Sequence, residues 1–183
     1  MNSSIVLAML ELFLLKYQGG IFMLVVLEGI VMCFVLLIIC VVLIANGPVG
    51  GVVFYEDDVK KRVVVLGYTT EKKIKKRSAI ATTALFIPLF TLVPFMVYGI
   101  NGAVGFWSGF WQMSVIMLIM GLFDRLFIDC YWVEHTKAWN IEGTEDLKPY
   151  IPFKVKVSKW ISTTVGFPVL SAIIAWVMSF IVR

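Results

Sequence analysis

Four long apolar runs constrain what this chain can fold into more than any other feature of its sequence. Each run is long enough to cross a bilayer as a helix, which takes about 20 residues. The runs cover residues 23–45, 79–100, 103–123 and 160–182. Backbone N–H and C=O groups find no partners in hydrocarbon, so each run must satisfy its own hydrogen bonds, and a helix does so. None of the runs alternates apolar and polar residues with a period of two, as a membrane barrel strand does.

The composition points to the same class of protein. Hydrophobic residues make up 60% of the 183 residues and charged residues only 15%, whereas soluble domains average about 25% charged residues. We therefore predict an all-α polytopic membrane protein, built as a bundle of four transmembrane helices with amphipathic cytoplasmic segments.

The first 22 residues predict no span of their own. Their apolar stretch is short, is interrupted by Glu11, and lacks the small-residue cleavage site of a secretory signal. Gln18-Gly19-Gly20 can be encoded by codons that contain a bacterial ribosome-binding site, at the usual distance before a Met23 codon. We therefore expect residues 1–22 to be a doubtful leader and residues 23–183 to form a single membrane domain, with Met1 as the alternative start.

Two loops hold most of the basic residues, and this sets the predicted orientation. The loops 46–78 and 124–159 contain all but two of the 16 Lys and Arg residues. In a four-span protein these loops share a side, and the positive-inside rule places them in the cytoplasm with both termini outside. The predicted tryptophan anchors are Trp107 and Trp111 at the outer interface, and Trp132, Trp139 and Trp160 at the inner interface.

The first loop ends in a polybasic cluster that runs into the second span. The cluster follows a break at Gly67 and a helix cap expected at Thr69 or Thr70. Such clusters attract anionic lipid headgroups at about 1 kcal/mol per basic residue, and they also determine topology. Both interpretations stay open for the candidate headgroup-binding residues Lys72, Lys73, Lys75, Lys76 and Arg77.

Helix-breaking residues and one carboxylate lie inside the runs. Pro88 and Pro94 remove helix hydrogen bonds from the second run, and Pro168 does so in the fourth, so we expect kinks there. Glu28 lies inside the first run. We expect Glu28 to reach the outer surface if the chain starts at Met23, and to be a functional candidate if the chain starts earlier.

The segment 121–147 carries charged residues directly after the third run. Continued as a helix to residue 139, the third span would be about 50 Å long, so it must project from the bilayer or bend along its surface. Arg125 and Asp129 are four residues apart and predict a structural ion pair. Asp124, Asp129 and the single histidine, His135, are the candidate catalytic residues. A straight helix keeps Asp124 about 16 Å from His135, so a joint site would need a further loop.

The sequence contains no cofactor motif. The weak candidate metal ligands Glu142, Glu145 and Asp146 lack the spacing of a metal motif, and a solvated helix cap explains them equally well. The cysteines form no CxxC pair, and none is paired with a histidine in a zinc motif. Nucleic acid is not an expected partner, because the basic residues adjoin apolar spans and no recognition module surrounds them.

Two sequence blocks resemble a group of small multi-pass membrane proteins of Gram-positive bacteria. They are YEDDVKKRVVVLGYTTEKKIK in the first loop and FDRLFID followed by HTKAWNIEGTEDLKPYIP after the third run. The resemblance covers most of residues 23–183, and it implies a bacterial cell-membrane location without implying an activity. The signatures of membrane CDP-alcohol transferases, CAAX-type proteases and isoprenylcysteine methyltransferases are absent.

Three classes of function remain open on the sequence. A non-catalytic membrane subunit or lipid-contacting scaffold is favoured, with membrane lipids and copies of itself or other membrane subunits as partners. The alternatives are a small oligomeric transporter or channel, because four spans are few for a monomeric carrier, and an inner-leaflet membrane enzyme. A polar cavity that reaches mid-membrane would favour transport, and a cavity at the cytoplasmic edge would favour an enzyme. A structure with neither cavity would favour the scaffold.

Overall fold

The computed structural model describes the backbone of residues 3–182 and the side chains of residues 19–182. The described residues are helical and contain no strand. The elements are α1 (Ser3–Ile44), η1 (Pro48–Phe54), α2 (Asp57–Val65), α3 (Glu71–Pro94), η2 (Phe95–Ile100), α4 (Gly105–Phe123), η3 (Asp124–Val133), η4 (Lys137–Trp139), η5 (Glu145–Leu147), α5 (Phe153–Ile161), η6 (Ser162–Gly166) and α6 (Phe167–Ile181). Residues 3–22 of the predicted leader form the first turns of α1, whereas Met1 and Asn2 lie outside the described residues.

Three helical segments of the described chain are long and apolar enough to cross a membrane. They are Gly19–Ile44, Glu71–Ile100 and Phe153–Ile181, and they contain the first, second and fourth predicted spans. The third predicted span forms α4 but is not among them, so the prediction of four spans holds only for three. Helix α4 packs between α1 and α6, and in this position it buries polar side chains such as Gln112 and Ser114.

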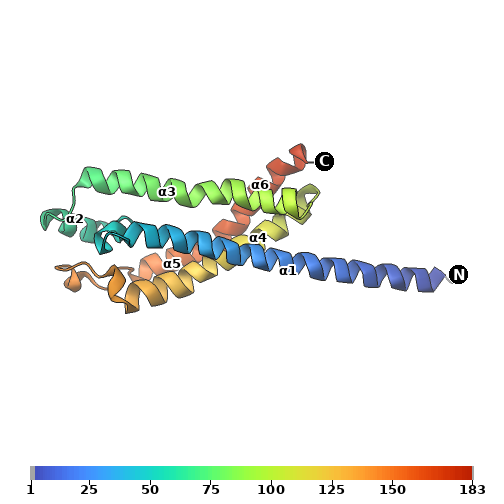
Figure 1. The fold of residues 1–183 in the computed structure, drawn as a ribbon, viewed down its shortest axis with the longest axis horizontal. Coiled ribbons are helices and arrows are strands. Elements are labelled where there is room, and N and C mark those ends of the chain that lie inside the picture. The colour runs from blue at the N-terminus through green and yellow to red at the C-terminus, as the bar shows by residue number, and fades with distance from the viewer. Residues whose placement is uncertain (1–2, 183) are drawn as a thin grey trace.

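The helices form an elongated bundle in which the two basic loops share one end (Figure 1). Helix α2 and the segment after α4 lie together at that end, and both ends of the chain lie toward the other. Helix α3 runs from the loop end to the opposite end, and α4 returns from there. We call these two ends the loop end and the terminal end.

Glycines set the distance between α4 and its neighbours. A Cβ atom on Gly121 would lie 2.6 Å from side-chain atoms of Phe167 and Thr163, and one on Gly29 would lie 2.8 Å from Ile119. Both distances are shorter than real Cβ contacts, so these two positions require glycine if the helices are to approach this closely. In membrane bundles such close approach by small residues is a main source of helix association.

Two of the three predicted helix-breaking prolines, Pro94 and Pro168, lie beside wider helical turns. Helix α3 continues through Pro88 and becomes the π-helical η2 directly after Pro94. The π-helical η6 joins α5 to α6 just before Pro168. Proline lacks an N–H and crowds the carbonyl of the preceding turn, and a π-helical turn is one way to accommodate this.

A compact cap, formed by residues 48–70 and 136–151, closes the loop end. The Tyr55 hydroxyl donates to the Trp139 carbonyl at 2.8 Å, and its ring stacks on Tyr150 with centroids 4.6 Å apart. Burial raises the pKa of the Tyr55 hydroxyl, so this group stays protonated and can donate. The Arg62 guanidinium makes two hydrogen bonds to the Asp146 carboxylate, at 3.0 and 3.2 Å.

Trp139 is one predicted interface anchor that the structure places elsewhere. The helix that continues from α4 ends at His135 rather than at residue 139, and the chain then turns back at Thr136. This turn brings the Trp139 ring against Gly51, where a Cβ atom would lie 2.6 Å from the ring. Trp139 is therefore only 1% exposed and forms the centre of the cap.

We expect Gly121→Ala to lower the stability of the bundle by about 1–3 kcal/mol, because the added methyl group overpacks the contact with Phe167. The change can be measured as the thermal unfolding midpoint in detergent, followed by tryptophan fluorescence. Gly166→Ala is the matched control, since its Cβ atom would meet nothing closer than 3.4 Å. Equal midpoints for the two variants would show that α4 and α6 do not depend on this close approach.

Candidate functional site

A cavity of about 360 Å³ lies between the helices near the loop end. Its apolar walls come from α1, α3, α4 and α6, with Leu36, Leu85, Leu89, Met120, Phe167 and Leu170 among the lining residues. Tyr55 and Trp139 of the cap line it too. Its charged wall consists of Asp124, Arg125 and Asp129 of η3 and Lys159 of α5. The cavity is therefore amphipathic.

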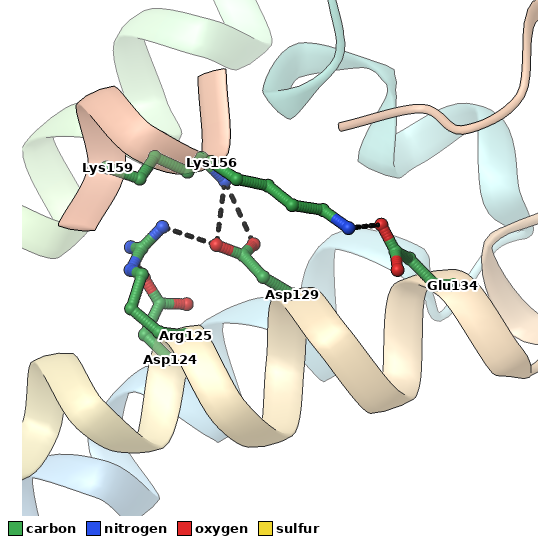
Figure 2. Close-up of polar contacts among 6 residues, drawn as sticks. All are labelled: Asp124, Arg125, Asp129, Glu134, Lys156 and Lys159. Carbon is green, nitrogen blue, oxygen red and sulfur yellow. Dashed lines mark hydrogen bonds and ion pairs between the residues drawn. The ribbon is translucent and has the colours of Figure 1, made fainter. Parts of the chain in front are cut away.

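The charged wall is a closed network of ion pairs, shown in Figure 2. The Lys159 ammonium donates to both carboxylate oxygens of Asp129, at 2.9 and 3.1 Å. The Arg125 guanidinium pairs with Asp129 and also with Asp124. Two acids and two bases balance in charge, which is what burial at the edge of an apolar bundle requires.

The local helix geometry explains how η3 presents this network. Arg125 and Asp129 are four residues apart, so their side chains leave the helix on the same face and meet. Both are buried, with exposed fractions of 9% and 6%. Helix α5 passes above them, and its Lys156 forms a second, more exposed ion pair with Glu134 (Figure 2).

The three candidate catalytic residues do not form one site. Asp124 and Asp129 line the cavity, whereas His135 is exposed and lines a separate pocket with Lys148 and Tyr150. The His135 Nδ1 atom lies 2.8 Å from the Cys130 carbonyl oxygen, and its ring stacks on Tyr131. Both carboxylates are committed to Arg125 and Lys159, so the network does not present a free base beside an imidazole.

Two of the three candidate metal ligands have other partners. Asp146 pairs with Arg62, and the Glu145 carboxylate accepts a hydrogen bond from the Gly143 N–H at 3.1 Å. Glu142 is exposed. Among the residues that the structure describes, no three His, Cys, Asp or Glu side chains come close enough together to hold a metal ion.

The polybasic cluster occupies the first two turns of α3. The Thr70 hydroxyl accepts the Lys73 N–H at 3.4 Å and so caps this helix, as one of the two alternatives predicted. All five basic side chains of the cluster are exposed, namely Lys72, Lys73, Lys75, Lys76 and Arg77. Of the remaining predicted anchors, Trp107 is 74% and Trp111 36% exposed, and Trp132 and Trp160 are half-buried.

Two buried hydrogen-bond donors on cavity-lining residues have no acceptor. They are the Arg125 Nε–H and the Trp139 Nε1–H. A buried donor without a partner costs about 1–3 kcal/mol, so native proteins usually satisfy it. Both unsatisfied groups are donors, so a partner that compensates them must supply acceptor atoms.

Sequence reasoning missed Lys159 as part of this site. The signal was present, because two neighbouring carboxylates, Asp124 and Asp129, have only one cation, Arg125, on their own helix and need a second one for charge balance. No local pattern distinguishes Lys159 from the other basic residues of the third loop, since the pairing joins residues 30 positions apart.

Comparison with protein-family models, with curated proteins and with solved structures finds no match to this chain. What the cavity and its ion-pair network do must therefore be argued from their geometry and chemistry.

We expect Asp129→Asn to lower the unfolding free energy by about 2–4 kcal/mol, because it strands the Lys159 ammonium near an apolar cavity and leaves Arg125 with Asp124 alone. Chemical or thermal unfolding in detergent measures this loss. Asp57→Asn is the control, since its ion pair with Lys60 is solvent-exposed and should contribute no more than about 0.5 kcal/mol. In the double variant with Lys159→Met, part of the loss should be restored, and strictly additive losses would show that the two groups are not coupled.

Proposed function

We propose that this chain is a non-catalytic multi-pass protein of the bacterial cell membrane that binds a membrane lipid in its loop-end cavity. One observation carries the proposal: the cavity joins apolar walls to a charge-balanced polar wall at the place where the bundle meets its basic loops. An amphiphile offers the matching combination of an apolar chain and a polar group. The resemblance to small membrane proteins of Gram-positive bacteria supports the location.

The course of α4 supports four membrane crossings. Helix α3 ends at the terminal end and α6 also reaches it, while α4 runs back from the terminal end to the loop end (Figure 1). If α3 and α6 cross a bilayer, α4 must cross the same thickness. Its 19 residues are about 28 Å long, close to the hydrocarbon thickness. With four crossings, the positive-inside rule places the loop end in the cytoplasm.

The unsatisfied donors support a lipid with acceptor oxygens, such as the ester and phosphate oxygens of a glycerophospholipid. The Arg125 Nε–H and Trp139 Nε1–H belong to residues of the polar wall and the cap. The volume of about 360 Å³ lies at the lower end of the range for ligand pockets. It accommodates one chain or the polar region of a lipid, and the rest of the molecule would stay in the bilayer.

The same geometry weighs against the two alternatives. An inner-leaflet enzyme that uses Asp124, Asp129 and His135 would need these groups free and close together. Both carboxylates are held by cations, and His135 lies in another pocket. A transporter would need a polar path toward mid-membrane. Beyond its charged wall this cavity is lined by side chains such as Leu36 and Leu89.

We predict that reporter fusions will place residues 46–78 and 124–159 in the cytoplasm and the C-terminus outside. The basic residues of these two loops and their common position at one end motivate this expectation. Alkaline phosphatase fused after residue 182 should be active, and the same enzyme inserted after Gly67 should be inactive. Activity at Gly67 would reverse the proposed orientation.

We predict that Leu89→Trp will reduce lipid binding at least about tenfold, because the larger side chain occupies the cavity. A photoreactive phospholipid is incubated with the full chain in mild detergent, and covalent adducts are counted by mass spectrometry. Ile87→Trp on the same helix is the control, since Ile87 is 56% exposed and does not line the cavity.

Trp139→Phe tests the polar half of the same cavity. It keeps an aromatic ring against Gly51 but removes one unsatisfied donor, and we expect adduct formation to fall several-fold. Peptide mapping of the wild-type adduct should find labels on cavity residues. Labels confined to the outer faces of the helices, with Leu89→Trp unchanged, would rule out a lipid in this cavity.

A further inference from the structure

A second buried polar cluster lies at the terminal end of the bundle, away from the lipid cavity. It joins Glu28 of α1 to Asn101, which follows η2, and to Gln112 of α4. Glu28 is 5% exposed and Gln112 is 1% exposed. Glu28 is therefore enclosed by its neighbours in this structure. The expectation that it reaches the outer surface applied to a chain that starts at Met23.

Hydrogen bonds fix the direction of each group in this cluster. The Asn101 Nδ2 atom donates to Glu28 Oε2 and to Gln112 Oε1, both at 2.9 Å. The Gln112 Nε2 atom donates to the Ser108 hydroxyl at 3.2 Å. Both N–H groups of the Asn101 amide are thus used, and its own oxygen is left over.

Two acceptor oxygens in the cluster have no donor. They are Glu28 Oε1 and Asn101 Oδ1, and both are buried. Among residues with described side chains, no Lys, Arg or His forms an ion pair with Glu28. The buried Tyr98 hydroxyl of η2 also has no partner among the described side chains.

An isolated carboxylate is costly inside a membrane bundle, and the cost is removed when a positive charge joins it. One carboxylate among neutral amides and a hydroxyl carries a single negative charge, which one monovalent cation balances. A divalent ion would leave a positive charge uncompensated. Carboxylate and amide oxygens are ligands that hard cations prefer.

We propose that Glu28, Asn101 and Gln112 form a binding site for one monovalent cation, either a sodium ion or a proton. Glu28 supplies the charge, Asn101 Oδ1 supplies a second oxygen, and Gln112 holds the Asn101 amide in place. A sodium ion would contact both unsatisfied oxygens. A proton on Glu28 would turn one of them into a donor. The site involves different residues from the lipid cavity, so it does not depend on the proposed function.

The test compares the full chain with Glu28→Gln, which keeps the size of the side chain and removes the charge. Thermal unfolding in detergent is recorded with sodium chloride and with choline chloride at equal ionic strength, each over a range of pH. A rise in the midpoint with sodium that occurs in wild type and not in Glu28→Gln assigns a sodium ion. A midpoint that depends on pH in wild type more than in the variant, without a sodium effect, assigns a proton.

Carbodiimide labelling gives a second measurement on the same protein. The reagent modifies protonated carboxyl groups in apolar surroundings, and mass spectrometry of the Glu28 peptide counts the product. A sodium site predicts at least about fivefold slower labelling with sodium than with choline, and Gln112→Leu should reduce this protection. A proton site predicts labelling that falls with rising pH and ignores sodium. Identical responses of wild type and Glu28→Gln to sodium and to pH, together with a Glu28 peptide that neither condition protects, would falsify the proposal.

Discussion

The Asp129 carboxylate, which pairs with two cations, holds the loop end of this bundle together. This carboxylate is buried between Arg125 on its own helix and Lys159 on α5, so it ties the end of the central helix to the start of the last one. In an apolar environment the loss of one partner leaves another charge uncompensated, and the network therefore acts as a unit. The charged wall of the cavity and the position of α5 both depend on this contact.

Much of the fold could be predicted from local sequence, because local rules determine it. The helical class, three of the four spans, the break at Gly67 and the cap at Thr70 follow from hydropathy and from capping chemistry. The third predicted span forms the central helix α4, which packs between α1 and α6 and buries Gln112.

The remaining parts of the candidate sites depend on contacts between distant residues. Trp139 looks like an interface anchor in sequence, but the turn at Thr136 brings it back against Gly51. Lys159 and Asn101 gain their partners only when helices pack, 30 and 73 positions away along the chain. No periodicity or spacing encodes such pairings. The two ends also differ in chemistry: the unsatisfied groups beside the cavity are donors, whereas those near Glu28 are mostly acceptors.

The bond between Tyr55 and Trp139 also sets an order of assembly. The two residues are 84 positions apart, so the first loop cannot complete its half of the cap until α4 and the following turn have been synthesised. At about 5–20 residues per second, this interval is roughly 4–17 seconds. During that time Val52, Val59 and Val63 of the first half would be exposed beside the growing chain. The polybasic turns of α3 directly follow this half of the cap, so binding of these turns to an anionic surface would keep the loop near the site where its partner emerges.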